Sequence, residues 1–236
     1  MTAYYKATTA DGTSFGAPEI TWRVGSITRD PLPAPSGTGL CAEGLLRAAT
    51  VPTETLVSRD TIDIREGWRL FEVAPYDSLV TSEHYPDRVG CRAWMVLAEL
   101  PKSLALGPQG SQVMEIIDRA GVLTSQELAQ FETEQASTRY EAREEVRANG
   151  HSAAAYARRQ SAWTAAWDAA EGAVRTALPV APCPYHDRLD ATEAARDAVL
   201  ALVTWDLWHG DRGREMRDLL IAPWAEVIGL PEGLGC

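Results

Sequence analysis

Cysteine and histidine residues are the first candidates for chemistry, because their side chains bind zinc or act as nucleophiles. Cys183 and His186 lie close together in a proline-rich segment, and His209 and Cys236 follow further along the chain. Thiolate and imidazole ligands at such a local spacing are typical of zinc sites. The sequence offers no second closely spaced pair to complete the coordination. We therefore expect an incidental Cys and His in a rigid loop, with no bound metal and no cofactor.

Nucleophilic catalysis would require Cys41 or Cys91 to lie next to His84. Cys91 adjoins an expected strand, where a free cysteine is usually a small and inert core residue. The sequence also contains no Walker loop, GxGxxG fingerprint, GxSxG elbow or HExxH motif. From these observations we assign no catalytic residue.

Glu132 and Glu134 form the one paired-carboxylate motif. Two glutamates at this spacing on a loop can bind a ribose and activate a nucleophile, as in arginine-specific ADP-ribosyltransferases. Here both fall within an expected helix, in which positions i and i+2 point to different faces. We favour a solvated helix face over a catalytic pair, and an ADP-ribosyltransferase-like enzyme stays as an alternative.

The C-terminal half is rich in tryptophan, which is enriched at the energetic centres of protein interfaces. Most of these rings should fill a core, and one or two at its rim would anchor a partner protein. The remaining aromatic anchors are expected on a charged helix at 124–149, which offers a second surface. The expected partner-binding residues are Trp163, Trp167, Trp208, Trp224, Phe131 and Tyr140.

The charge of the chain restricts its partners. The formal net charge is -11 at pH 7 and no basic run is present, whereas binding to nucleic-acid phosphates requires clustered Lys and Arg. No window reaches the roughly 18 consecutive apolar residues of a membrane span, and the N-terminus does not resemble a secretion signal. The scattered cysteines suit a reducing compartment. We expect a cytoplasmic protein that neither crosses a membrane nor binds nucleic acid directly.

Residues 1–106 are expected to form a β-rich domain. Stretches of strand-like composition alternate with turn signals such as Asp11-Gly12. The stretch at 68–73 has apolar residues on both faces, which is typical of a central strand. Expected strands lie at 3–8, 20–24, 68–73 and 92–97, with a strand or turn at 40–44, a helical turn at 52–56 and an exposed loop at 81–88.

Residues 111–236 are expected to form a helical domain. Helices are predicted at 112–120, 124–149, 151–178, 190–208 and 211–221, the last followed by a tail that folds back. The sequence Thr124-Ser125-Gln126-Glu127 is a capping box, and Asp190 with Glu193 forms a second one. The run 198–208 is apolar on nearly every side, so other elements must surround it. The fold class is therefore α+β, with a small mixed or antiparallel β-sheet followed by an α-helical bundle.

Four short motifs stand out in the N-terminal half: Tyr4-Tyr5-Lys6-Ala7, Trp22-Arg23-Val24-Gly25, Gly39-Leu40-Cys41-Ala42 and Trp68-Arg69-Leu70-Phe71-Glu72-Val73. Together they resemble an uncharacterised domain family common in actinobacterial phages. The chain departs from the family at the turn after Leu40, which lacks the family's histidine. The C-terminal half is similar to the Ala/Trp-rich helical regions often attached to that domain. The resemblance implies an actinophage or prophage origin and carries over no catalytic residue.

The expected function is that of a phage accessory or regulatory protein that binds another protein. One specific form is a recombination directionality factor, which binds a large serine integrase and switches it from integration to excision. Such a factor would stabilise one arrangement of the integrase's mobile coiled-coil arm. An anti-defence or host-takeover inhibitor is a further alternative, and it would also act by binding a protein.

Overall fold

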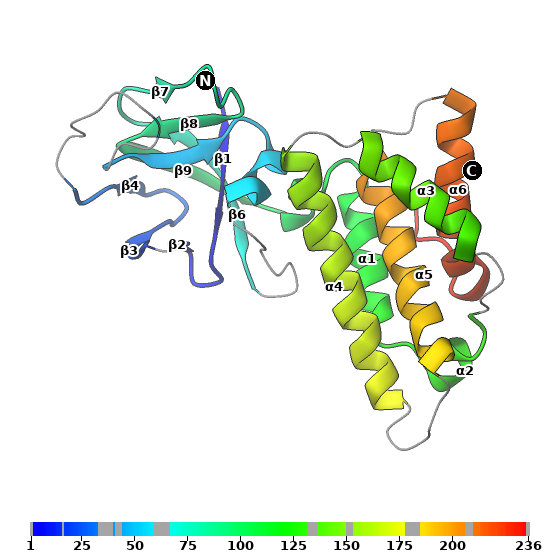
Figure 1. The fold of residues 1–236 in the computed structure, drawn as a ribbon. Helices are drawn as coiled ribbons and strands as arrows, with labels where there is room; N and C mark the ends of the chain where they lie inside the picture. The colour runs from blue at the N-terminus through cyan, green and yellow to red at the C-terminus, as the bar shows by residue number, and fades with distance from the viewer. Residues whose placement is uncertain are drawn as a thin grey trace. The chain divides into compact units, whose positions relative to one another are not determined.

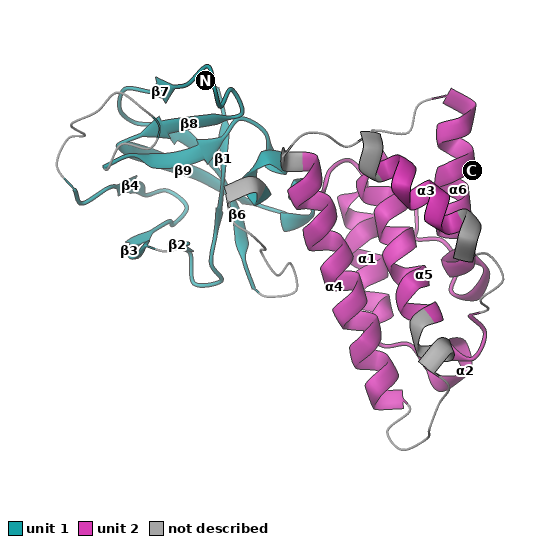
Figure 2. Cartoon of the chain, viewed as in Figure 1, with its two compact units in different colours: residues 1–105 teal, residues 106–236 magenta. Residues whose placement is uncertain are grey.

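The computed structural model describes residues 2–15, 17–32, 40, 44–58, 67–131, 136–149, 153–177, 185–205 and 210–234. The chain divides into two compact units, residues 1–105 and residues 106–236 (Figure 2). Strands dominate the first unit and helices the second (Figure 1). The predicted α+β class is confirmed.

The first unit contains a seven-stranded antiparallel sheet in the order β4-β9-β6-β1-β5-β8-β7, so β1 is the middle strand. Its strands are β1 (Tyr4–Thr8), β4 (Ile27–Arg29), β5 (Leu46–Ala49), β6 (Arg69–Pro75), β7 (Val80–Thr81), β8 (Arg88–Cys91) and β9 (Ala93–Leu100). A second, two-stranded sheet pairs β2 (Thr13–Ser14) with β3 (Ala17–Thr21). Two 3-10 helices, η1 (Pro52–Ser58) and η2 (Lys102–Leu106), complete the elements up to the start of the second unit.

A large apolar cluster of the first unit lies on one face of the large sheet. Lys6 of β1 lies opposite Phe71 of β6, and side chains that face each other in an antiparallel pair share a face. That face buries a cluster that includes Trp22, Phe71 and Trp94. The indole N–H groups of Trp22 and Trp94 donate to Ser14 Oγ and to the Leu46 carbonyl, at 2.8 and 2.9 Å. The register therefore places a lysine on the core face of the middle strand.

Sequence patterns located the central strands better than the short ones. The predictions at 3–8, 68–73 and 92–97 coincide closely with β1, β6 and β9, and η1 begins at Pro52 as expected. The strand expected at 20–24 begins earlier, as β3. Strands β4 and β8 were not predicted, because three or four residues are too few to show a clear alternation.

The second unit is a helical bundle. Its helices are α1 (Gly110–Ala120), α2 (Ser125–Leu128), α3 (Ala136–Asn149), α4 (Ala153–Ala177), α5 (Tyr185–Val203) and α6 (Gly210–Val227). Helix α5 packs against α1, α4 and α6, and its residues 197–203 are all buried. This confirms that the apolar run beginning at Ala198 lies at the centre of the bundle. No helix in the described ranges has both the length and the apolar character needed to cross a membrane.

Several predicted helix boundaries are wrong, among them the end of the helix expected at 190–208, because α5 ends at Val203. The Thr124–Glu127 capping box is present, but α2 ends at Leu128 and α3 begins only at Ala136, so 124–149 is not one helix. Asp190 lies buried inside α5, which begins at Tyr185, and therefore does not cap it. Pro223 lies within α6, which runs past Ile221 to Val227. The adjacent Trp224 is buried in the bundle.

Candidate functional site

The six aromatic residues expected to bind a partner have different environments. Phe131 and Trp224 are buried in the bundle core with ring centroids 6.2 Å apart, which corrects the prediction that they lie at a rim. Trp163 and Trp167 are half-buried on α4. Tyr140 on α3 is 59% exposed, and Trp208 lies outside the described residues. Within the described members of this set, only Tyr140 presents most of its side chain to solvent.

Trp163 and Trp167 hold a cation of the bundle itself. Arg196 of α5 places its Cζ 3.3 Å from the ring centroid of Trp163 and 4.5 Å from that of Trp167. The two rings lie one helical turn apart on α4, so both contact the same guanidinium. Burial lowers the pKa of Arg196 to about 10, against the opposing effect of the Glu193 carboxylate. These two tryptophans therefore join α4 to α5.

An ionic network joins α3 to α5. The buried Asp197 carboxylate accepts two hydrogen bonds from Arg143, at 2.5 and 2.7 Å, and lies 3.6 Å from Arg139. Arg143 also pairs with Glu193. Burial raises the pKa of Asp197, whereas the hydrogen bonds from Arg143 lower it. Through this network the inner face of α3 is fixed to the centre of the bundle.

The outer face of α3 is acidic around Tyr140. Glu141 is exposed beside it, and Glu144 lies one turn further along the helix. Glu145 pairs with Arg212 of α6 at 3.2 Å. An exposed tyrosine with acidic neighbours is complementary to a basic protein surface.

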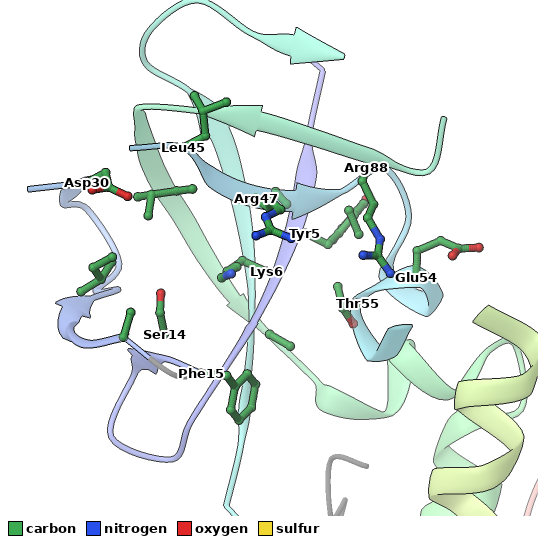
Figure 3. A pocket seen from close by; sticks show the side chains of 16 residues that line it. Tyr5, Lys6, Ser14, Phe15, Asp30, Leu45, Arg47, Glu54, Thr55 and Arg88 are labelled. Carbon is green, nitrogen blue, oxygen red and sulfur yellow. The ribbon is translucent and has the colours of Figure 1, made fainter. Parts of the chain in front are cut away.

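The first unit contains a cavity of about 360 Å³ between β1 and β5 (Figure 3). In the described part of the sheet these two strands share a single pair, Tyr5 with Ala49, so the ladder between them is open beyond that pair. Both strands contribute charged side chains to the lining, and the β2–β3 hairpin and η1 supply further polar groups. The polar and charged lining includes Tyr5, Lys6, Ser14, Asp30, Arg47, Glu54, Thr55 and Arg88.

Lys6 lies in a partly buried environment within this cavity. Its Nζ lies 5.3 Å from the centroid of the buried Trp22 ring. Burial, and next the positive charge of Arg47, lower the pKa of Lys6 from 10.5 to about 8. In the parts of the chain that the structure describes, neither Lys6 nor Arg47 forms an ion pair with a carboxylate. Arg88, by contrast, lies 3.7 Å from Asp87.

The chain matches no family model, no curated protein and no solved structure. Its candidate sites therefore rest on its own residues.

The other residues with chemical potential form no site in the described ranges. Cys91 is buried, and its thiol donates to the carbonyls of Asp77 and Ala93, at 3.3 and 3.0 Å, which is the core role that the sequence indicates. Cys41, Glu132, Glu134, Cys183, His209 and Cys236 lie outside the described residues, as does the side chain of His186. No cluster of three or more potential metal ligands occurs among the residues described.

The sequence analysis missed Lys6 and Arg47, although one signal was present. Tyr4, Lys6 and Thr8 share one face of β1 because side chains alternate along a strand, so the expected strand already placed a lysine between two residues of the inner face. Arg47 gave no such signal. It reaches the cavity only because β5 pairs with β1 more than forty positions away in the chain.

Proposed function

We propose that the protein is a phage regulatory protein that binds a basic partner protein through the outer face of α3. The observation that supports this most directly is Tyr140. Its side chain is 59% exposed on a helix whose opposite face buries Ala142 and Val146, and Asp197 holds Arg139 and Arg143 of the same helix. An aromatic side chain on a fixed helix loses little conformational entropy when it is buried by a partner.

The partner is basic because the binding surface is acidic. Glu141 and Glu144 flank Tyr140, and the whole chain carries a net charge of -11. Complementary charge accelerates association and excludes partners of like charge. Proteins that bind DNA carry basic surfaces, because they must neutralise phosphates.

Within this class we propose a large serine integrase as the partner, and recombination directionality as the activity. A bound factor changes the outcome of recombination only if it binds one arrangement of the integrase more tightly than another. Support comes from the resemblance of the N-terminal motifs to a phage domain family and from the acidic face of α3.

The test is direct binding to the purified integrase encoded by the same phage genome, followed by recombination of excision substrates in vitro. The wild-type protein should bind and activate excision. Tyr140→Ala should weaken binding at least tenfold, which is about 1.4 kcal/mol. Tyr156→Ala is the matched control, since Tyr156 is 57% exposed but lies on α4. Absence of binding by the wild-type protein would refute the integrase proposal.

An inhibitor of a host protein would use the same kind of surface, and the same variants separate the two proposals. If the integrase does not bind but a host protein does, and Tyr140→Ala abolishes that binding, α3 is the binding face of an inhibitor. If both tyrosine variants bind the integrase equally well, the partner contacts another face and the role of α3 is refuted.

A further inference from the structure

We propose that the cavity between β1 and β5 binds a small organic anion, whose carboxylate or phosphate group lies between Lys6 and Arg47. The inference concerns the first unit alone. It is independent of the surface proposed on α3, so failure of either proposal leaves the other intact.

The main argument is that two cations face one cavity without a counter-ion. Within the described residues neither Lys6 nor Arg47 pairs with a carboxylate, although other arginines of the same unit do, such as Arg69 with Glu99. Figure 3 shows the two side chains on neighbouring strands at the middle of the cavity lining. Lys6 is partly buried, and the nearby positive charge of the exposed Arg47 disfavours its ammonium form. An anion between them would offset that effect, which makes the arrangement a binding site for negative charge.

The rest of the lining indicates what kind of anion fits. Ile20, Leu46 and Phe15 supply apolar surface, and the volume of about 360 Å³ falls within the range of roughly 300–1,000 Å³ typical of small-molecule sites. Asp30 and Glu54 also line the cavity and would repel a highly charged ligand. The composition therefore favours a compact ligand with an apolar body and one acidic group, and disfavours polyphosphates and nucleic acid.

Binding of such an anion is linked to the protonation of Lys6. A neighbouring negative charge stabilises the ammonium form, so the ligand should raise the Lys6 pKa from about 8. The other charged groups that line the cavity are Arg47 of β5, Asp30 after β4, Glu54 of η1 and Arg88 of β8. Without ligand, a Lys6 pKa of about 8 leaves about a quarter of the amine unprotonated at pH 7.5, so the side chain should react readily with acylating reagents.

The first experiment exploits the scarcity of lysine, since Lys6 and Lys102 are the lysines of the chain. The full-length protein is acetylated with trace acetic anhydride over a range of pH, and both lysine peptides are quantified by mass spectrometry. The probes are inorganic phosphate and benzoate, each added separately. We expect at least one probe to slow acetylation of Lys6 several-fold and to raise its apparent pKa, with Lys102 unaffected.

The two probes separate the possible headgroups. Protection by phosphate alone identifies a phosphate ester, and protection by benzoate alone identifies a carboxylate with an apolar body. If neither anion protects Lys6 at tens of millimolar, or if Lys102 is slowed equally, the proposal is wrong.

Substitutions then test the two cations individually. Lys6→Met and Arg47→Met should each lower the affinity for the protecting anion at least tenfold in calorimetric titrations. Arg23→Met is the matched control and should bind normally, because Arg23 is exposed in the same unit but does not line the cavity. Arg47 is itself exposed, so its replacement should not disturb folding. Unchanged affinity in Arg47→Met would overturn the assignment even if Lys6→Met fails to fold.

Discussion

The cations at the centre of the helical unit lie against carboxylates, whereas two cations at the cavity of the β-rich unit do not. In the helical unit, Arg139 and Arg143 both lie against Asp197, and Arg196 pairs with Glu193 between two tryptophans. In the β-rich unit, Lys6 and Arg47 line a cavity, and no described carboxylate pairs with either. A buried charge is costly unless it is paired. The paired charges are therefore explained by the fold, whereas the partly buried charge of Lys6 is the observation behind the proposed anion site.

The ionic network around Asp197 also carries a desolvation cost. Burial raises the pKa of Asp197 although the hydrogen bonds from Arg143 oppose the rise. Such networks stabilise little relative to apolar packing, but they are costly to break, because the remaining partners stay buried and charged. What the network contributes is the orientation of α3.

Breaking the ionic network around Asp197 should change the free energy of unfolding most. Asp197→Ala leaves Arg139 and Arg143 without their shared carboxylate and should lower the free energy of unfolding by about 3–5 kcal/mol. Urea melts of the full-length protein measure this. Glu171→Ala is the control, since it removes an exposed pair with Arg175 and should cost no more than about 0.5 kcal/mol. A cost below about 1 kcal/mol for Asp197→Ala would show that the helical unit does not depend on its paired charges.

Replacing Lys6 should stabilise the protein, whereas breaking the ionic network should destabilise it. The pKa of Lys6 is lowered in the folded state, so below pH 8 both states carry the proton and the folded state bears the whole cost. Lys6→Met should therefore raise the free energy of unfolding by about 2 kcal/mol at pH 7, after allowance for partial solvent exposure. Between the folded value of about 8 and the unfolded value of 10.5, only the unfolded state keeps the proton, so wild-type stability rises with pH.

The decisive measurement is the pH dependence of the stability difference between Lys6→Met and the wild type. The advantage of Lys6→Met over the wild type should shrink steadily between pH 8 and pH 10 in parallel denaturant melts. Lys102→Met provides the comparison for general effects of losing a lysine. A gain that is constant over this range would show that improved packing, and not loss of a buried charge, stabilises the variant.

Much of the fold could be read from local patterns. Strand-like composition marks β1 and β6, and Trp163, Trp167, Ala170 and Val174 recur at helical spacing along α4. The Thr124 capping box is also encoded locally. The points at which a helix is interrupted or continues were harder to predict, because they depend on tertiary packing. Helix α6 continues through Pro223 while Trp224 is buried against Phe131, a contact between segments far apart in the chain.

The candidate site was less predictable than the fold. Helical spacing does not distinguish a core tryptophan from one at a rim, which is why Trp224 and Phe131 were assigned to a surface. The position of Lys6 in its strand was predictable, but its meaning depends on Arg47, which reaches the same cavity through the sheet topology. Sequence patterns can therefore indicate a charge on an inner face, but not whether another charge faces it.

A smaller effect is expected from the cation held between two rings. Arg196→Lys keeps the positive charge but loses the planar guanidinium that contacts Trp163 and Trp167, so it should lower the free energy of unfolding by about 1 kcal/mol. Thermal melts followed by tryptophan fluorescence measure the change. Arg175→Lys, at an exposed pair, should melt like the wild type. If both variants melt alike, the Arg196 guanidinium contributes only its positive charge, and its contacts with the two tryptophan rings do not stabilise the helical unit.

The smallest effect on stability should come from Arg47→Met, yet this variant tests the contrast between the units most closely. Arg47 is exposed, so the free energy of unfolding should change by no more than about 0.5 kcal/mol. The pKa of Lys6 should nevertheless rise, because one of the two causes of its lowering is removed. It should stay below 10.5, because burial is the larger cause and persists. The pH profile of Lys6 acetylation measures this, with Arg23→Met as the reference. If Arg47→Met leaves that profile unchanged, the charge of Arg47 does not affect Lys6. The contrast between the cavity of the β-rich unit and the ionic network of the helical unit would then be wrong.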